Sequence, residues 1–266
     1  MRSTADKLLA ILRRDLLTAI RHRSGFVVML VGVFMELAAF YFLSRAVGPG
    51  FRPDGVEYFP FLLVGTGVYT FFVMSAQAFL STVQEAQQTG TMEVLMTTST
   101  EPAELVVLSS ISAFAGNLVS LGVYLLAGVV VFRATIHADV LSCLVVLILS
   151  IVIALALGIV VATMQITLQK GSAVLWLLSS GFWFLSGALF PNQSLPRPLE
   201  LLAHLVPLTY AMDGMRMAFL QGRSLIAMAP TLATLAAFAA VLLPLALGGF
   251  SLSLQCARRR GTLSFY

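Results

Sequence analysis

Four carboxylates lie close together in the stretch 83–104 (VQEAQQTGTMEVLMTTSTEPAE), which contains neither lysine nor arginine: Glu85, Glu93, Glu101 and Glu104. Met92, Leu95 and Met96 recur at helical spacing and form one apolar stripe, while Glu93 falls elsewhere on the helix surface. Such a helix could pair its carboxylates with cationic groups while its stripe packs against an apolar surface. We interpret the stretch as a docking element for a soluble partner, with a water-facing turn as the simpler alternative.

Two long uncharged runs, residues 59–80 and 105–132, flank this polar stretch. A helix rises about 1.5 Å per residue, so each run is long enough to cross the ~30 Å hydrocarbon core of a bilayer. The stretch 83–104 is therefore expected to be the loop between two membrane spans. Thr98 and Glu101 have capping-box spacing ahead of Pro102, which indicates where the next helix begins.

The composition of the whole chain agrees with this interpretation. Its 266 residues are 59% hydrophobic and 11% charged, with a mean hydropathy of +0.94, as in a polytopic membrane protein. The net charge of +4 comes from cations near the ends of apolar runs, which suits anionic lipid headgroups better than nucleic acid. We expect an all-α fold with six transmembrane helices at residues 25–43, 59–80, 105–132, 140–164, 173–190 and 226–254.

Two segments outside these spans have patterns of their own. Residues 3–23 place apolar and cationic side chains on opposite arcs, which predicts an amphipathic helix in the membrane interface. Residues 191–222 are apolar but interrupted by prolines, which predicts short re-entrant helices in the outer leaflet. A further proline, Pro244, should kink the last span.

The distribution of cations predicts the orientation in the membrane. The segment before the first span, the loop with Lys170 and the C-terminal tail carry ten cationic side chains, against six in the loops on the other side. The positive-inside rule then places both termini, and the loop 83–104, in the cytoplasm of a multi-pass protein of the cell (inner, or cytoplasmic) membrane.

Glu36 is the only charged residue within the first predicted span. It lies roughly 17 Å deep at about 1.5 Å per residue, so it should face protein or water rather than lipid. Candidate hydrogen-bond donors on the second span are Thr66, Tyr69, Thr70 and Gln77. Glu36 could be a hydrogen-bonded acid that fastens the first helix to its neighbours, or it could line a transport pathway.

Several kinds of active site are missing from the sequence. No G-x-S-x-G, H-E-x-x-H or Cys-x-x-Cys motif is present, and His22, His137 and His204 are too scattered to suggest a metal site. Cys143 and Cys256 are not expected to pair. The only lysines, Lys7 and Lys170, do not follow a phosphate-binding loop, so we expect no ATPase site and no bound cofactor in this chain.

Two motifs in this order resemble those of ABC-2 type transporter permeases. The first runs Glu85-x(4)-Gly90-Thr91-Met92-Glu93-x-Leu95-Met96 and resembles the cytoplasmic signature of the drug-export and Nod-factor-export branch, except that Ser99 stands where many members have proline. The second comprises the run SGALFP ending at Pro191, followed by Pro207-x-x-Tyr210-x-x-Asp213-x-x-Arg216. The resemblance covers nearly the whole chain.

The resemblance implies the membrane-spanning subunit of an ATP-driven exporter of drugs, lipids or lipid-linked glycans. Two permease chains, identical or different, would form the pathway, and the signature from Glu85 to Met96 would dock on a separate ATPase subunit that holds ATP and Mg. Pro191, Pro207, Tyr210, Asp213 and Arg216 would be candidates for an outer gate. For Asp213 and Arg216, a local ion pair on one helix is the simpler interpretation. An ion-coupled carrier or channel with Glu36 as its protonatable site is the alternative function.

Overall fold

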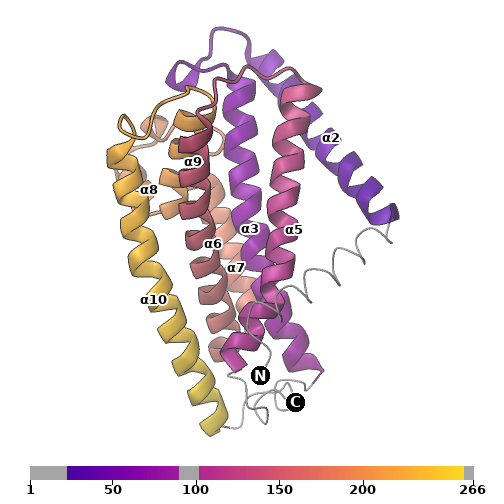
Figure 1. Ribbon diagram of the computed structural model, residues 1–266, viewed down its shortest axis with the longest axis vertical. Helices are drawn as coiled ribbons and strands as arrows, with labels where there is room; N and C mark the ends of the chain where they lie inside the picture. Colours follow the sequence, from indigo (N-terminus) through magenta and orange to yellow (C-terminus); the bar gives the residue numbers. More distant parts are fainter. Residues whose placement is uncertain (1–22, 90–101, 261–266) are drawn as a thin grey trace.

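The computed structural model describes residues 23–89 and 102–260. The predicted interfacial helix 3–23 therefore lies almost entirely outside the described residues, as do the signature residues Gly90 to Met96. The described residues form helices joined by short connections and contain no strand, which confirms the all-α fold (Figure 1).

A helix lies at each of the six predicted spans. These helices are α2 (Arg23–Val47), α3 (Tyr58–Gln88), α5 (Pro102–Val130), α6 (Val140–Leu168), α7 (Gly171–Leu185) and α10 (Ala229–Arg260). Within the described residues, four segments are long and apolar enough to cross a membrane: Val27–Val47, Tyr58–Gln88, Val140–Leu168 and Ala229–Ala257. The apolar segment Phe114–Val130 of α5 and the whole of α7 are shorter. The count of six spans therefore stays a prediction.

The helix ends differ from the predicted ones in two places that matter for function. α3 continues past Leu80 to Gln88, and near its end Gln87 is buried and bonded to Gln165 of α6. Residues 83–88 therefore belong to α3. α7 ends at Leu185 instead of Phe190, and Gly187 then turns the chain with a φ of 77°.

The proline-rich segment 191–222 forms short helices, as its sequence predicts. A 3-10 turn spans Asn192–Ser194, α8 spans Arg197–Ala203 and α9 spans Pro207–Phe219. A proline stands in the first turn of both α8 and α9, where its missing N–H costs no helical hydrogen bond.

The bundle is built around α3, which packs against α2, α5, α6, α7 and α9. In Figure 1 the upper end of α3, where the helix begins, lies near the ends of α2 and α5. At its lower end, Gln87 bonds to Gln165 in the last turn of α6. Among the described helices, α2 packs mainly against α3 and α5 and leans away from the bundle, so that Val28, Met35 and Phe42 are exposed. Lipid or another protein chain can cover such an apolar face.

Candidate functional site

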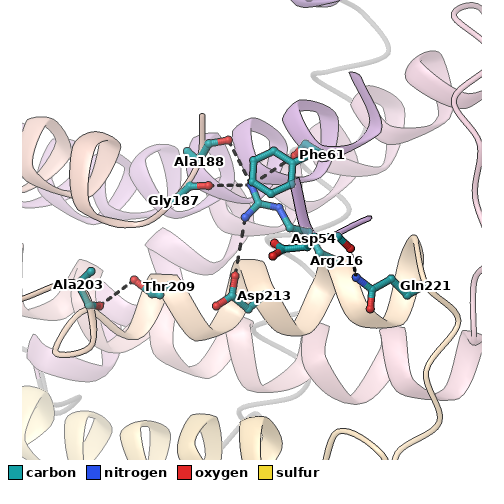
Figure 2. Close-up of polar contacts among 9 residues, drawn as sticks. All are labelled: Asp54, Phe61, Gly187, Ala188, Ala203, Thr209, Asp213, Arg216 and Gln221. Atoms are coloured by element: carbon teal, nitrogen blue, oxygen red, sulfur yellow. Dashed lines mark hydrogen bonds and ion pairs between the residues drawn. The ribbon is translucent and has the colours of Figure 1, made fainter. Parts of the chain in front are cut away.

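Arg216 on α9 is the centre of a polar site at the upper end of the bundle, and only 4% of its side chain is exposed. Its Nη2 donates hydrogen bonds to the carbonyl oxygens of Gly187 (2.8 Å), Ala188 (3.2 Å) and Phe61 (3.3 Å) (Figure 2). The guanidinium carbon lies 3.5 Å from the centroid of the Phe61 ring, in a cation–π arrangement. One side chain therefore ties α9 to α3 and to the turn after α7.

The backbone around Arg216 is shaped to receive it. A Cβ atom at Gly65 of α3 would overlap Nη2 of Arg216 and the carbonyl oxygen of Ala188. Gly67, further along α3, leaves room in the same way for Tyr124 of α5. Both glycines therefore lie where another segment of the chain approaches α3 closely.

Asp213 forms the predicted local ion pair with Arg216, but the pair is loose. The Asp213 Oδ1 lies 3.8 Å from Nη1 of Arg216, and 40% of the Asp213 side chain remains exposed to a cavity. Burial of the carboxyl by the surrounding protein raises the pKa of Asp213 to about 6, with Arg216 opposing the shift and Asp54 adding to it. The carbonyl hydrogen bonds, rather than this ion pair, fix the position of Arg216.

The structure brings three of the five gate candidates to one cavity of about 370 Å³, which is lined by Pro191, Asp213 and Arg216. Tyr210 lies beside this cavity, since its hydroxyl is 3.4 Å from Nδ1 of His204 on the cavity wall. Pro207 is buried at the first turn of α9 and does not line the cavity. The candidates therefore share one region, but only some of them face the same space.

Sequence reasoning missed other residues of this cavity. Asp54 faces it from the connection between α2 and α3, together with Asn192 after α7. Asp54 has a φ of 52°, within a Pro-Asp-Gly turn that the sequence shows plainly. That signal predicts a turn at residues 53–55, but it carries no information on the distant helix that the turn meets.

Glu36 on α2 is half-buried and meets α5. Its carboxyl is hydrogen-bonded to the Tyr124 hydroxyl, and that hydroxyl lies 2.9 Å from Thr66 Oγ1 of α3. Thr66 Oγ1 in turn donates to the Leu62 carbonyl at 2.6 Å. Of the predicted donors, Thr66 reaches Glu36 only through Tyr124, whereas Tyr69 donates to the Ser179 carbonyl instead. The direct partner, Tyr124, lies on α5 rather than on the second span, where the donors were expected.

A polar network with a buried centre joins three segments at the lower end of the bundle. Gln165 of α6 is 1% exposed; its Nε2 donates to Gln87 Oε1 of α3 at 2.9 Å, and its Oε1 accepts from the Gly171 N–H at 2.8 Å. Gln84 Nε2 donates to Ser172 Oγ at 2.9 Å. Glu85, the first residue of the predicted signature, is exposed on the same turn of α3. The end of α3 is thus bonded to the connection between α6 and α7.

No group of three or more metal-ligating side chains that could hold an ion occurs within the described residues. The family described as ABC-2 type transporter matches residues 6–220, which is most of the chain and includes both sequence motifs. A search of curated proteins finds no match.

Proposed function

We propose that this chain, which belongs to the ABC-2 type transporter family, works as an exporter. As a member of that family it is the membrane-spanning permease subunit of an ABC transporter. Its substrate is an amphipathic compound: a drug, a lipid or a lipid-linked glycan. The energy comes from ATP, held with Mg on a separate nucleotide-binding subunit. A second permease chain completes the pathway, in the cell (inner, or cytoplasmic) membrane with both termini in the cytoplasm.

The polar network at the lower end carries this proposal. A partner that pushes on the loop after Gln88 moves the last turns of α3, and Gln87 and Gln84 pass that displacement to Gln165 and Ser172. The bond between Gln165 and Gln87 is buried, so breaking it costs more than breaking a bond that water can replace, whereas the bond between Gln84 and Ser172 is exposed. A displacement of α3 caused by docking can therefore be transmitted to α6 and α7.

Docking is tested by reversing the charge of the signature. The variant Glu85→Lys plus Glu93→Lys should insert and fold normally but lose export, and ATP hydrolysis by the partner should no longer respond to the permease. The matched variant Glu85→Gln plus Glu93→Gln removes the charges without adding opposite ones and should lose less. Coupled transport in reconstituted vesicles and co-purification with the ATPase are the measurements. Normal assembly and normal transport by the Lys variant would show the docking role to be wrong.

The rival function, an ion-coupled carrier or channel with Glu36 as its protonatable site, requires no ATPase. The hydrogen-bonded chain from Glu36 ends at a backbone carbonyl, which favours a link between helices over a path for protons. Purification without added partners separates the two functions: the carrier transports alone, whereas the exporter needs its ATPase.

A further inference from the structure

A larger cavity, of about 740 Å³, opens at the upper end of the bundle. Its walls come from the last turn of α2, the connection 48–57 and the turn after α5, three segments far apart in the sequence. Each segment contributes one arginine to the lining: Arg45, Arg52 and Arg133. Among the described residues that line it, Glu57 is the one carboxylate. The fold thus gathers three dispersed cations into one concave surface.

These three guanidinium groups have little to neutralise them. Within the part of the chain that the structure describes, none of them lies within 4.0 Å of a carboxylate. Arg45 is held in place by Tyr41, whose hydroxyl accepts from Nε at 3.3 Å and from Nη2 at 3.0 Å. All three arginines are exposed, so their remaining N–H groups can reach a ligand in the cavity.

The cavity also has an aromatic wall, which continues towards the bilayer along α2. The rings of Tyr41, Phe59 and Phe132 line it with centroids 5.5–5.6 Å apart. Phe34, about two turns deeper on α2 at roughly 3.6 residues per turn, lies 5.7 Å from the ring of Phe132 and is itself exposed. A charged rim therefore passes directly into an apolar surface that lipid chains can follow.

We propose that this cavity binds the phosphate headgroup of an anionic amphiphile, with its apolar chain along the aromatic wall. Guanidinium groups form paired hydrogen bonds to phosphate oxygens, and a volume between about 300 and 1,000 Å³ is usual for a small-molecule site. The cavity of Asp213 and Arg216 is a separate space that also contains Asp54, so it does not suit an anion. The site needs neither ATP nor a partner subunit, so it stands independently of the exporter function.

The test uses the whole chain, purified in a non-ionic detergent. Binding of dioctanoyl phosphatidic acid, dioctanoyl phosphatidylcholine and inorganic phosphate is measured by calorimetry at two salt concentrations. We expect phosphatidic acid to bind and phosphatidylcholine to bind at least about tenfold more weakly. Displacement of the lipid by millimolar inorganic phosphate would assign the site to a free anion as well. Lack of displacement would assign it to the lipid, because the aromatic wall then contributes to affinity.

Matched variants separate the cavity from general surface charge. Arg52→Ala plus Arg133→Ala should weaken phosphatidic acid binding by about tenfold or more, whereas Arg197→Ala plus Arg223→Ala, which removes the same charge elsewhere on the chain, should not. Glu57→Gln removes the opposing carboxylate and should tighten binding. Because misfolding cannot produce a gain in affinity, this variant tests the site even if the double variant fails to fold. Equal losses in both double variants, or no preference for phosphatidic acid, would overturn the proposal. The proposal would also be overturned if a second copy of the chain closed the cavity. In that case the three arginines would be protected from chemical labelling in the dimer but not in the monomer.

Discussion

Arg216 donates a 2.8 Å hydrogen bond to the carbonyl oxygen of Gly187, and this bond joins the two halves of the second sequence motif. The run SGALFP turns at Gly187 with a positive φ, which exposes successive carbonyl oxygens on one side of the chain. The helix that begins at Pro207 presents Arg216 to those oxygens. The motif thus describes a receptor turn and the arginine that fills it, rather than two independent gate elements.

Arg216→Met should destabilise the protein, because it leaves the carbonyl oxygens of Gly187, Ala188 and Phe61 without this buried donor. We expect a loss of about 2–4 kcal/mol, with a smaller loss for Arg216→Lys, which keeps the charge but not the planar fork. Thermal unfolding in detergent, followed by tryptophan fluorescence, measures the change. Arg197→Met, at an exposed position on α8, is the control and should differ from wild type by less than about 0.5 kcal/mol. Equal unfolding temperatures for the two variants would contradict this role.

Gly65→Ala should disturb the same site from the opposite side. The added methyl group would overlap Arg216 and the Ala188 carbonyl, and forcing such an atom into a packed interior costs about 1–3 kcal/mol. Gly122→Ala in α5 is the matched control, because nothing lies within 4 Å of its added Cβ and alanine favours helix. Both variants are compared by thermal unfolding. A Gly65→Ala protein as stable as the Gly122→Ala protein would mean that Arg216 can move aside.

Much of the fold could be predicted from the sequence, because hydropathy and length depend on residues within one segment. Each predicted span contains a helix, and the prolines of residues 191–222 mark short helices correctly. The predicted second span ends at Leu80 with the apolar run, whereas the helix that contains it continues through polar residues. Polar residues such as Gln87 suggest water, yet here they bond to Gln165 on another helix, so the helix continues to Gln88.

The candidate site was less predictable, since its contacts join residues that local patterns do not connect. Periodicity placed Arg216 near Asp213 on one helix, and that pair exists. Periodicity could not show that the carbonyl oxygens of Gly187 and Phe61 accept hydrogen bonds from Arg216, or that Tyr124 contacts Glu36. The three arginines of the large cavity lie in two different predicted loops on the same side of the membrane, and the sequence does not show that they meet, because their segments come together only in the folded bundle.

Gln165→Leu should weaken coupling between ATP hydrolysis and transport. It removes the bonds to Gln87 and to the Gly171 N–H, both of them buried, at a cost of about 1–3 kcal/mol. We expect the complex with the ATPase to assemble while less substrate is moved per ATP. The control, Gln77→Leu, changes an exposed glutamine of α3 and should leave both quantities unchanged. Normal coupling in Gln165→Leu would remove this network from the transmission path.

Glu36→Gln should fold and transport normally at every pH. A glutamine amide can both donate to and accept from the Tyr124 hydroxyl, so the hydrogen-bonded chain to Thr66 is preserved. Tyr124→Phe breaks the chain and should cost about 1 kcal/mol in unfolding free energy. The measurements are thermal unfolding and transport at acidic, neutral and alkaline pH. A Glu36→Gln protein that is assembled but altered in transport, or in its pH dependence, would place Glu36 in the pathway instead.

Protonation of Asp213 should increase the free energy of unfolding as the pH falls from about 7 to about 4. Its pKa is raised to about 6 from an ordinary value of 3.8, so the folded protein binds this proton more tightly than the unfolded chain does. Stability from this group is therefore gained as the pH falls through about 6 and lost as it rises again. Asp213→Asn removes the titrating group, so its unfolding temperature should exceed that of the parent protein at about pH 7.5 and converge with it near about pH 4.5. His204 lies close enough to contribute, so both proteins carry His204→Gln and the comparison isolates the carboxyl. If the difference between the two unfolding temperatures stays constant over this range, Asp213 is ionised throughout, and the loose ion pair with Arg216 outweighs burial.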